Sequence, residues 1–157
     1  MEALLLTLAV VATMANAVVY GTDVFSALVQ RPAMAHVDDA ALTSAMGQIH
    51  RFGDARMPVP GVFGLVATVG TAAVAGFDGN VTVSVAAGVA ALSLVVWLVI
   101  YNKISAPVNK ELTGAALDCR VAPEARALQR TWDSVINARV LLQAVALGAM
   151  CLALAAS

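Results

Sequence analysis

Four long apolar stretches alternate with polar segments along the chain. They cover about residues 3–28, 59–77, 81–101 and 135–156. A helix of about 20 apolar residues is long enough to cross the hydrocarbon core of a bilayer. We therefore predict an all-α integral membrane protein, a single domain over residues 1–157 that folds as an antiparallel four-helix bundle.

The predicted connections between the spans differ in length and chemistry. Asp78-Gly79-Asn80 has the residues of a tight turn and joins the second span to the third. Residues 31–57 and 102–134 form two larger, polar connections. Because each of them follows an odd-numbered span, both lie on the same side of the membrane. We expect them to cover one end of the bundle and to enclose a small-molecule site there.

The first large connection contains a short amphipathic helix over residues 37–52. Its apolar residues recur at helical spacing: Leu42, Met46, Ile49 and Phe52. Asp38 or Asp39 is placed to cap its start. Pro58 and Pro60 follow its end. The segment is too short and too polar to span a membrane.

The second large connection contains two prolines. Pro107 disfavours helical geometry at Ala106, so we predict a helix break there and a short helix over about residues 108–116. Asn109 then lies near the start of that helix. Pro123 is predicted to open the last helix, at a first-turn position where proline is tolerated.

Composition supports the membrane assignment. Hydrophobic residues make up 61% of the chain and charged residues 12%, against roughly 45–50% and 25% in ordinary soluble domains. A signal peptide begins with a positively charged segment, but the only charged residue before the first apolar stretch is Glu2. We therefore predict a span there and not a cleaved signal peptide. The net charge of −1 argues against a nucleic-acid partner.

The positive residues predict the orientation of the spans. The nine Lys and Arg residues are Arg31, Arg51, Arg56, Lys103, Lys110, Arg120, Arg126, Arg130 and Arg139. All of them lie on the side of the two large connections. Because positive residues concentrate in cytoplasmic loops, we predict that both connections are cytoplasmic and that both termini lie outside. Cys119 then faces a reducing compartment.

Polar residues inside the spans are the first candidates for a site, because a polar side chain in lipid needs a partner. In the first span, polar residues recur on one helical face: Thr13, Asn16, Tyr20 and Asp23. In the fourth span, Trp132, Arg139 and Gln143 share a face. Asp23 and Arg139 lie at similar depth, so we predict that they pair. Whether this pair is catalytic or only joins two helices is left open.

A metal site is a further hypothesis. His50 and Asp54 are four residues apart and share a helical face if the helix continues through Gly53. Together with Asp23 they are the candidate metal ligands. The sequence contains no HExxH, CxxC or Walker motif.

Small residues recur every four positions in the second span: Gly64, Thr68, Ala72 and Gly76. Such a stripe lets another helix approach closely. It serves packing inside the bundle, and a homo-oligomer formed through small-residue faces is a second use.

Several segments resemble a family of small four-span membrane proteins grouped with the fungal anthrone oxygenases. The segment APVNKEL is similar to the family's P-x-N signature after the third span, and Trp132 and Arg139 match its W-x6-R spacing at the fourth. GTDVFSALVQRPAM resembles the end of its first span, and AMGQIHRFGDARMPVPG resembles the first loop of members from high-GC bacteria. The resemblance extends over nearly the whole chain.

The resemblance implies an oxidoreductase of oxygenase type. The fungal relatives oxidise an anthrone to an anthraquinone with O2, and many bacterial members have no assigned activity. By this resemblance we expect a monooxygenase in a bacterial plasma membrane, acting on a small apolar, aromatic or polyketide-like metabolite. O2 is the expected co-substrate, and whether iron, copper or no metal takes part is left open.

The candidate site residues have distinct expected roles. Asp23 or His50 acts as base or metal ligand, and Arg139 stabilises an oxyanion. The expected substrate-binding residues are Asn109, Asn102, Trp132 and Tyr20. The alternative is a non-catalytic membrane accessory protein, carrier or scaffold, in which the same residues only satisfy one another.

Overall fold

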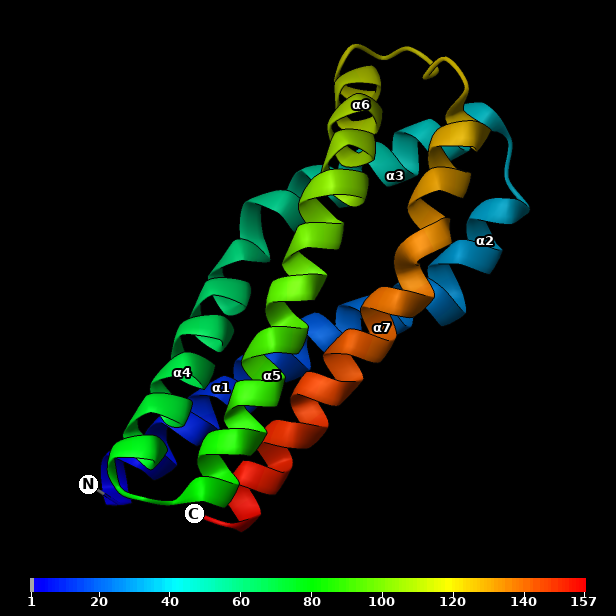
Figure 1. Ribbon diagram of the computed structural model, residues 1–157. Helices are drawn as coiled ribbons and strands as arrows, with labels where there is room; N and C mark the ends of the chain where they lie inside the picture. The colour runs from blue at the N-terminus through cyan, green and yellow to red at the C-terminus, as the bar shows by residue number, and fades with distance from the viewer. Residues whose placement is uncertain (1) are drawn as a thin grey trace.

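The computed structural model describes residues 2–157, and within them the chain is helical without strands (Figure 1). The elements are α1 (Glu2–Phe25), η1 (Ser26–Gln30), α2 (Arg31–Ala35), α3 (Asp39–Arg56), α4 (Pro58–Phe77), α5 (Val81–Ile100), η2 (Tyr101–Ser105), α6 (Ala106–Leu117) and α7 (Ala125–Ala155). The two η elements are single π-helical segments inside longer helices.

Four helices in the described chain are long and apolar enough to cross a membrane: Glu2–Ala35, Pro58–Phe77, Val81–Leu117 and Ala125–Ala155. α1 packs against α4 and α7, and α5 packs against the same two helices, so the four form a closed ring. Both termini and the α4–α5 turn lie at one end, and α3 and α6 lie at the other (Figure 1). The predicted all-α, multi-pass membrane bundle is confirmed. We refer to the two ends as the turn end and the α3/α6 end.

The turn end is built from small apolar side chains in close contact. Its core includes Ala9, Ala12, Ala87 and Ala90, each fully buried. At the turn itself, Gly79 has a φ of +75°, a left-handed conformation that glycine adopts without steric cost. The Asn80 side chain accepts a hydrogen bond from the Val83 backbone N–H at 3.2 Å and caps α5.

The small-residue stripe of the second span is used inside the chain. A Cβ built on Gly64 would lie 2.3 Å from Asn16 Oδ1, so only glycine lets α4 approach α1 this closely. Beside it, Asn16 Nδ2 donates to Thr68 Oγ1 at 3.3 Å. Gly76 lies against Ser84 of the next helix.

The expected helix break at Ala106 is wrong. The helix that begins at Val81 continues to Leu117, and the chain accommodates Pro107 by widening into the π-helical segment Tyr101–Ser105. Proline cannot donate to the carbonyl four residues before it and its ring crowds that carbonyl. In the π segment the Ala106 N–H reaches back five residues to the Tyr101 carbonyl, which makes room for the ring.

The first span behaves in the same way and is longer than expected. It continues to Ala35 through the π-helical segment Ser26–Gln30, which precedes Pro32. The Arg31 N–H bonds the Ser26 carbonyl, five residues back. The last helix begins at Ala125, so Pro123 lies just before it and not inside its first turn.

The amphipathic helix of the first connection is α3. Its predicted cap is confirmed, since Asp38 Oδ1 accepts from the Ala41 backbone N–H at 2.7 Å. Its buried residues are Leu42, Thr43, Met46, Gly47 and His50, whereas Ile49 and Phe52 are exposed. The helix also continues through Gly53, so His50 and Asp54 share one helix. α3 packs tightly on α6 at Gly47, where a Cβ would lie 2.4 Å from the Ala116 Cβ.

Candidate functional site

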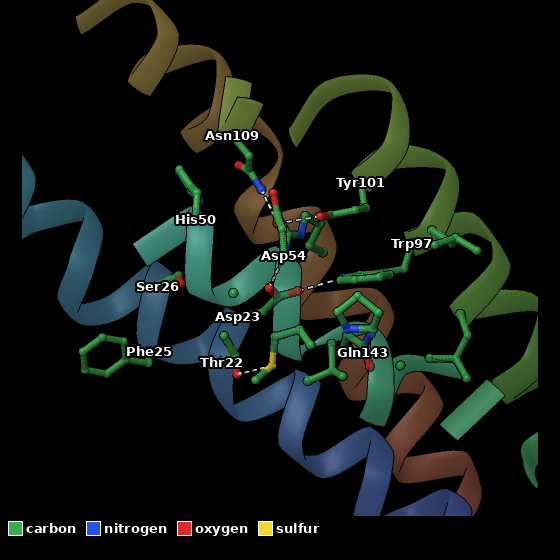
Figure 2. Close-up of a pocket in the computed structure, with 18 of the residues that line it drawn as sticks. Thr22, Asp23, Phe25, Ser26, His50, Asp54, Trp97, Tyr101, Asn109 and Gln143 are labelled. Carbon is green, nitrogen blue, oxygen red and sulfur yellow. Dashed lines mark hydrogen bonds and ion pairs between the residues drawn. The ribbon is translucent and has the colours of Figure 1, made fainter. Parts of the chain in front are cut away.

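A pocket of about 400 Å³ lies at the α3/α6 end, between the four spanning helices and beneath α3 (Figure 2). Most of its wall is apolar, with side chains such as Val19, Leu65 and Leu94. Figure 2 shows polar side chains converging on it from α1, α3, α5 and α6. An apolar cavity with a few convergent polar groups is the usual form of a small-molecule site.

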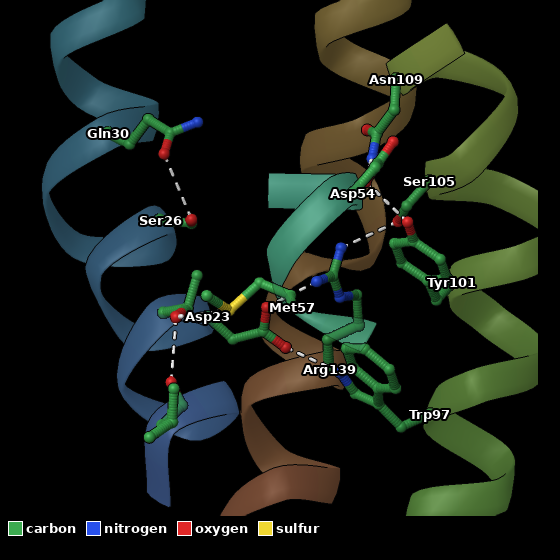
Figure 3. Close-up of polar contacts among 12 residues, drawn as sticks. Asp23, Ser26, Gln30, Asp54, Met57, Trp97, Tyr101, Ser105, Asn109 and Arg139 are labelled. Atoms are coloured by element: carbon green, nitrogen blue, oxygen red, sulfur yellow. Dashed lines mark hydrogen bonds and ion pairs between the residues drawn. The ribbon is translucent and has the colours of Figure 1, made fainter. Parts of the chain in front are cut away.

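Asp23 and Arg139 form an ion pair beside this pocket, as the sequence predicted (Figure 3). Arg139 Nη2 lies 2.5 Å from Asp23 Oδ1, and both side chains are buried. The other carboxylate oxygen accepts from Trp97 Nε1 at 2.7 Å. Arg139 Nη1 donates to Ser105 Oγ at 2.9 Å. The network therefore joins α1, α5, η2 and α7.

Aromatic rings enclose the Arg139 guanidinium. Its Cζ lies 5.1 Å from the ring centroid of Trp97, 5.1 Å from that of Trp132 and 5.7 Å from that of Tyr101. Cation–π attraction at these distances favours the charged guanidinium in a site with little water. The side chain is thereby fixed, while its Nε–H has no partner.

Asp54 joins α3 to the third spanning helix. Its Oδ1 accepts from Tyr101 Oη at 2.7 Å and from Asn109 Nδ2 at 2.8 Å (Figures 2 and 3). The Tyr101 ring also stacks on Trp97, with centroids 5.5 Å apart. These contacts close one side of the pocket, between α3 and the η2–α6 segment.

His50 lies at the top of the pocket with its Nε2 buried and without a partner. Its ring is 5.6 Å from that of Trp132. Burial lowers the pKa of the His50 imidazole from 6.5 to about 4, Asp54 opposes this shift, and the positive charge of Arg139 adds to it. His50 is therefore neutral at neutral pH, so one ring nitrogen can accept a proton.

Unpartnered polar atoms are concentrated at this pocket. In residues 2–157, six buried side-chain nitrogen or oxygen atoms have no hydrogen-bond partner. Five of them belong to residues that line the pocket: His50 Nε2, Asn109 Oδ1, Trp132 Nε1, Arg139 Nε and Gln143 Oε1. Buried polar groups are nearly always satisfied in folded proteins. Their concentration among the pocket-lining residues marks this end of the bundle as the candidate site, although the atoms themselves are buried beneath the cavity surface.

Most of the candidate residues are brought together, and two are not. The pocket is lined by Asp23, His50, Asp54, Asn109, Trp132 and Arg139. Asn102 is exposed outside the pocket, and its Nδ2 donates to the Leu98 carbonyl at 2.8 Å. Tyr20 is half-buried and does not line the pocket either.

The structure adds two aromatic residues that sequence reasoning missed. Trp97 and Tyr101 lie one helical turn apart and contact both carboxylates of the site. Aromatic residues at the end of an apolar span usually mark the membrane interface, so their position gave no signal of a site. The one available signal was their spacing of four, which places both rings on one helix face.

The proposed metal ligands are not assembled as a metal site. In the part of the chain that the structure describes, no three His, Cys, Asp or Glu side chains are grouped to hold a metal ion. His50, Asp54 and Asp23 all line the pocket, but each carboxylate is already bonded to the partners described above. As placed in the described residues, these three side chains therefore do not form a metal-binding cluster.

Comparison with known proteins gives no family to which the chain can be assigned. No family model, no curated protein and no solved structure matches it.

Proposed function

We propose that the protein is a membrane-embedded oxidoreductase of oxygenase type, acting on a small apolar metabolite with an aromatic or polyketide-like ring system. The observation that carries the proposal is the set of five unpartnered polar atoms in an otherwise apolar pocket. The motif resemblance to anthrone oxygenases supports the same class of reaction.

The unpartnered atoms are the partners that we propose for the polar groups of the ligand, and a side-chain rotation would bring each of them to the cavity surface. Trp132 Nε1 and Arg139 Nε are donors, so they suit a carbonyl or an oxyanion. Asn109 Oδ1 and Gln143 Oε1 are acceptors, so they suit hydroxyl groups. The apolar wall suits a ring system between them. A hydroxylated anthrone has this combination of groups.

The site also supplies the groups for oxidation of an activated methylene. His50 Nε2 takes a proton from the CH2 group, and the negative charge that develops on the enolate offsets the burial that lowers the imidazole pKa. The enolate oxygen is stabilised by the Arg139 and Trp132 donors. O2 then adds at that carbon and a proton completes a hydroperoxide. Loss of water converts the CH–OOH group to a carbonyl, so one O2 yields one carbonyl and one water.

The proposed location is a bacterial plasma membrane with the α3/α6 end in the cytoplasm. All nine Lys and Arg residues lie towards this end, and the α4–α5 turn carries none. The pocket then lies near the cytoplasmic boundary, where a metabolite made in the cytoplasm enters the bilayer.

The alternative is a non-catalytic accessory, carrier or scaffold protein. The observation in its favour is the hydrogen-bonded network of Asp23, Arg139, Trp97 and Ser105. This network joins three spanning helices, as a purely structural network would. A carrier, however, needs polar groups near the midplane or towards both faces. Between the pocket and the turn end, the buried polar side chains Asn16, Thr68, Thr71 and Ser93 bond one another or the backbone of their own helix, and the rest of the core there is apolar.

Oxygen uptake by the purified protein in lipid nanodiscs tests the proposal, with anthrone as the probe substrate. We expect uptake above that of empty nanodiscs, and at least a 100-fold loss of the protein-dependent rate in His50→Gln, since general-base catalysis is worth about 10²–10⁴-fold. The matched control is His36→Gln, because His36 is exposed and remote from the pocket. Equal rates in nanodiscs with and without protein, or an unchanged rate in His50→Gln, would reject the proposal.

A further inference from the structure

α1 and α4 separate from each other beside the pocket. At Gly64 the two helices touch, because a Cβ there would lie 2.3 Å from Asn16 Oδ1. Gly61 precedes Gly64 by three residues in α4 and lies on the same side of the helix. A Cβ on Gly61 would meet no atom within 4 Å. The gap between the helices therefore opens within one turn, and Gly61 lines the pocket at this point.

Beyond Gly61, Thr22 Oγ1 lies 3.8 Å from Met57 Sδ across the gap, along a dashed line in Figure 2. This contact is weak, because the Thr22 hydroxyl also donates to the Val18 carbonyl at 2.9 Å. We call this gap, with Thr22, Phe25, Met57, Pro58 and Gly61 around it, the α1–α4 opening. Phe25 is 56% exposed and points away from the polar side chains in Figure 2. The rim is thus almost entirely apolar.

The opening lies at the depth of the lipid chains. Gly61 is 16 residues from the end of α4 at Phe77, and Arg139 is 16 residues from the end of α7 at Ala155. At 1.5 Å per residue both are about 24 Å from the turn end. The hydrocarbon layer is about 30 Å thick, so pocket and opening face acyl chains near one boundary of this layer.

α3 covers the side of the pocket towards the nearer membrane surface. It docks on α6 through Gly47, and the interface contains Leu42, Met46 and Leu112, which are fully buried. Asp54 bridges the adjoining edge through its contacts with Tyr101 and Asn109, and Ile49 and Asp54 are the exposed α3 residues on this side of the pocket.

We propose that the α1–α4 opening is the entrance through which a bilayer-dissolved, planar apolar substrate reaches the pocket sideways from the membrane, and that Gly61 keeps it open. The inference rests on the proposed function for the identity of the entering molecule. It adds the route, and it restricts substrates to molecules that partition into lipid.

Tryptophan fluorescence can follow entry without any reaction, because the chain has two tryptophans and both line the pocket. In Trp97→Phe, the remaining indole of Trp132 is 5% exposed and reports only molecules that reach the pocket. The probes are 1,4-dibromobenzene, a contact quencher that dissolves in the bilayer and does not absorb tryptophan emission, and iodide, a quencher that stays in water. We expect 1,4-dibromobenzene to quench Trp132 strongly and iodide to leave it unchanged.

Closing the opening should stop the quenching. Gly61→Leu in the Trp97→Phe background is expected to reduce quenching by 1,4-dibromobenzene at least threefold. Gly148→Leu is the matched control, because Gly148 is also in a spanning helix with open space at its Cβ but does not line the pocket. Unchanged quenching in Gly61→Leu, or equal quenching by iodide, would overturn the proposal.

A reversible cross-link provides a second test, which does not depend on correct folding of the Gly61→Leu variant. Thr22→Cys and Met57→Cys, with Cys119 and Cys151 replaced by serine, place two thiols across the opening. A short bifunctional methanethiosulfonate reagent should suppress the quenching, and a reductant should restore it in the same sample. Quenching that persists after cross-linking contradicts the proposal. Because neither readout needs turnover, a failed oxygen-uptake assay with successful closure rejects the oxygenase function and leaves the entrance standing.

Discussion

At the scale of single residues, the Asp23–Arg139 pair combines two roles. It joins α1 to α7 inside the membrane, and it fixes the guanidinium of a residue that lines the pocket, with the Nε–H buried and without a partner. The pair was predictable from sequence because two charged residues at equal depth in apolar spans have few other partners. The rings around the guanidinium were not predictable, since their default role is at the membrane interface.

Removing one charge of this pair should lower the free energy of unfolding more than removing both charges. Asp23→Asn leaves the buried Arg139 charge without its counter-ion, which we expect to reduce the free energy of unfolding by about 3 kcal/mol or more. The double variant Asp23→Asn/Arg139→Gln should recover part of this loss, because no unpaired charge then remains. Denaturant titration in detergent micelles measures Asp23→Asn, Arg139→Gln and the double variant beside the wild type. Strictly additive losses would show that the two side chains do not interact.

His50 should make stability depend on pH in a defined window. The folded protein holds the His50 pKa at about 4, against 6.5 for an unperturbed histidine. Between these values the unfolded chain binds more protons, so stability falls as the pH is lowered from 6.5 to 4 and this contribution is constant above 6.5. His50→Gln should remove that part of the slope, while His36→Gln should keep it. Unfolding titrations at a series of pH values provide the comparison, and identical slopes in wild type and His50→Gln would refute the buried neutral imidazole.

At the scale of helices, the sequence pattern located the spans and missed how they end. Helical periodicity and turn residues identified α3, α4 and the turn at Gly79 closely. The rule that proline disfavours helix at the preceding residue failed at Pro107, because a π segment offers the chain another solution. In α3 the buried stripe includes His50 and excludes Ile49, since apolar residues can face lipid as well as the core. Periodicity alone cannot separate these two environments.

The docking of α3 on α6 should fail when Gly47 gains a methyl group. A Cβ at Gly47 would lie 2.4 Å from the Ala116 Cβ and 2.5 Å from the Leu112 carbonyl oxygen, so Gly47→Ala forces the helices apart. Gly114→Ala is the matched control, because its Cβ would meet nothing within 4 Å and alanine favours helix by about 1 kcal/mol. We expect amide hydrogen exchange in α3 to accelerate at least tenfold in Gly47→Ala and not in Gly114→Ala. Unchanged protection in Gly47→Ala would mean that α3 is not held by this contact.

At the scale of the whole molecule, polar chemistry and apolar packing occupy opposite ends of one bundle. The turn end contains the small-residue core, whereas all nine Lys and Arg residues and the pocket lie towards the α3/α6 end. Sequence reasoning anticipated this division, because the polar residues of the first and fourth spans cluster near one boundary. It did not anticipate the opening between α1 and α4, which depends on where two helices diverge.

The orientation of the bundle is testable with cysteine labelling. Cys119 is exposed in the connection between α6 and α7, at the α3/α6 end. If that end is cytoplasmic, a membrane-impermeant maleimide added to intact cells should leave Cys119 unlabelled. The same reagent should label Asp78→Cys, in the α4–α5 turn, when Cys119 and Cys151 are replaced by serine. Labelling of Cys119 with protection of position 78 would reverse the proposed orientation.

The central claim is that the pocket directs oxygen from O2 into an apolar ring substrate. The most direct measurement is the mass of the anthraquinone formed from anthrone under ¹⁸O2, by protein in nanodiscs beside empty nanodiscs. Our account predicts product in excess of the protein-free reaction, with the new carbonyl carrying one ¹⁸O atom, and loss of that excess in Arg139→Gln. An absence of excess product, or excess product that carries only ¹⁶O, would contradict the account.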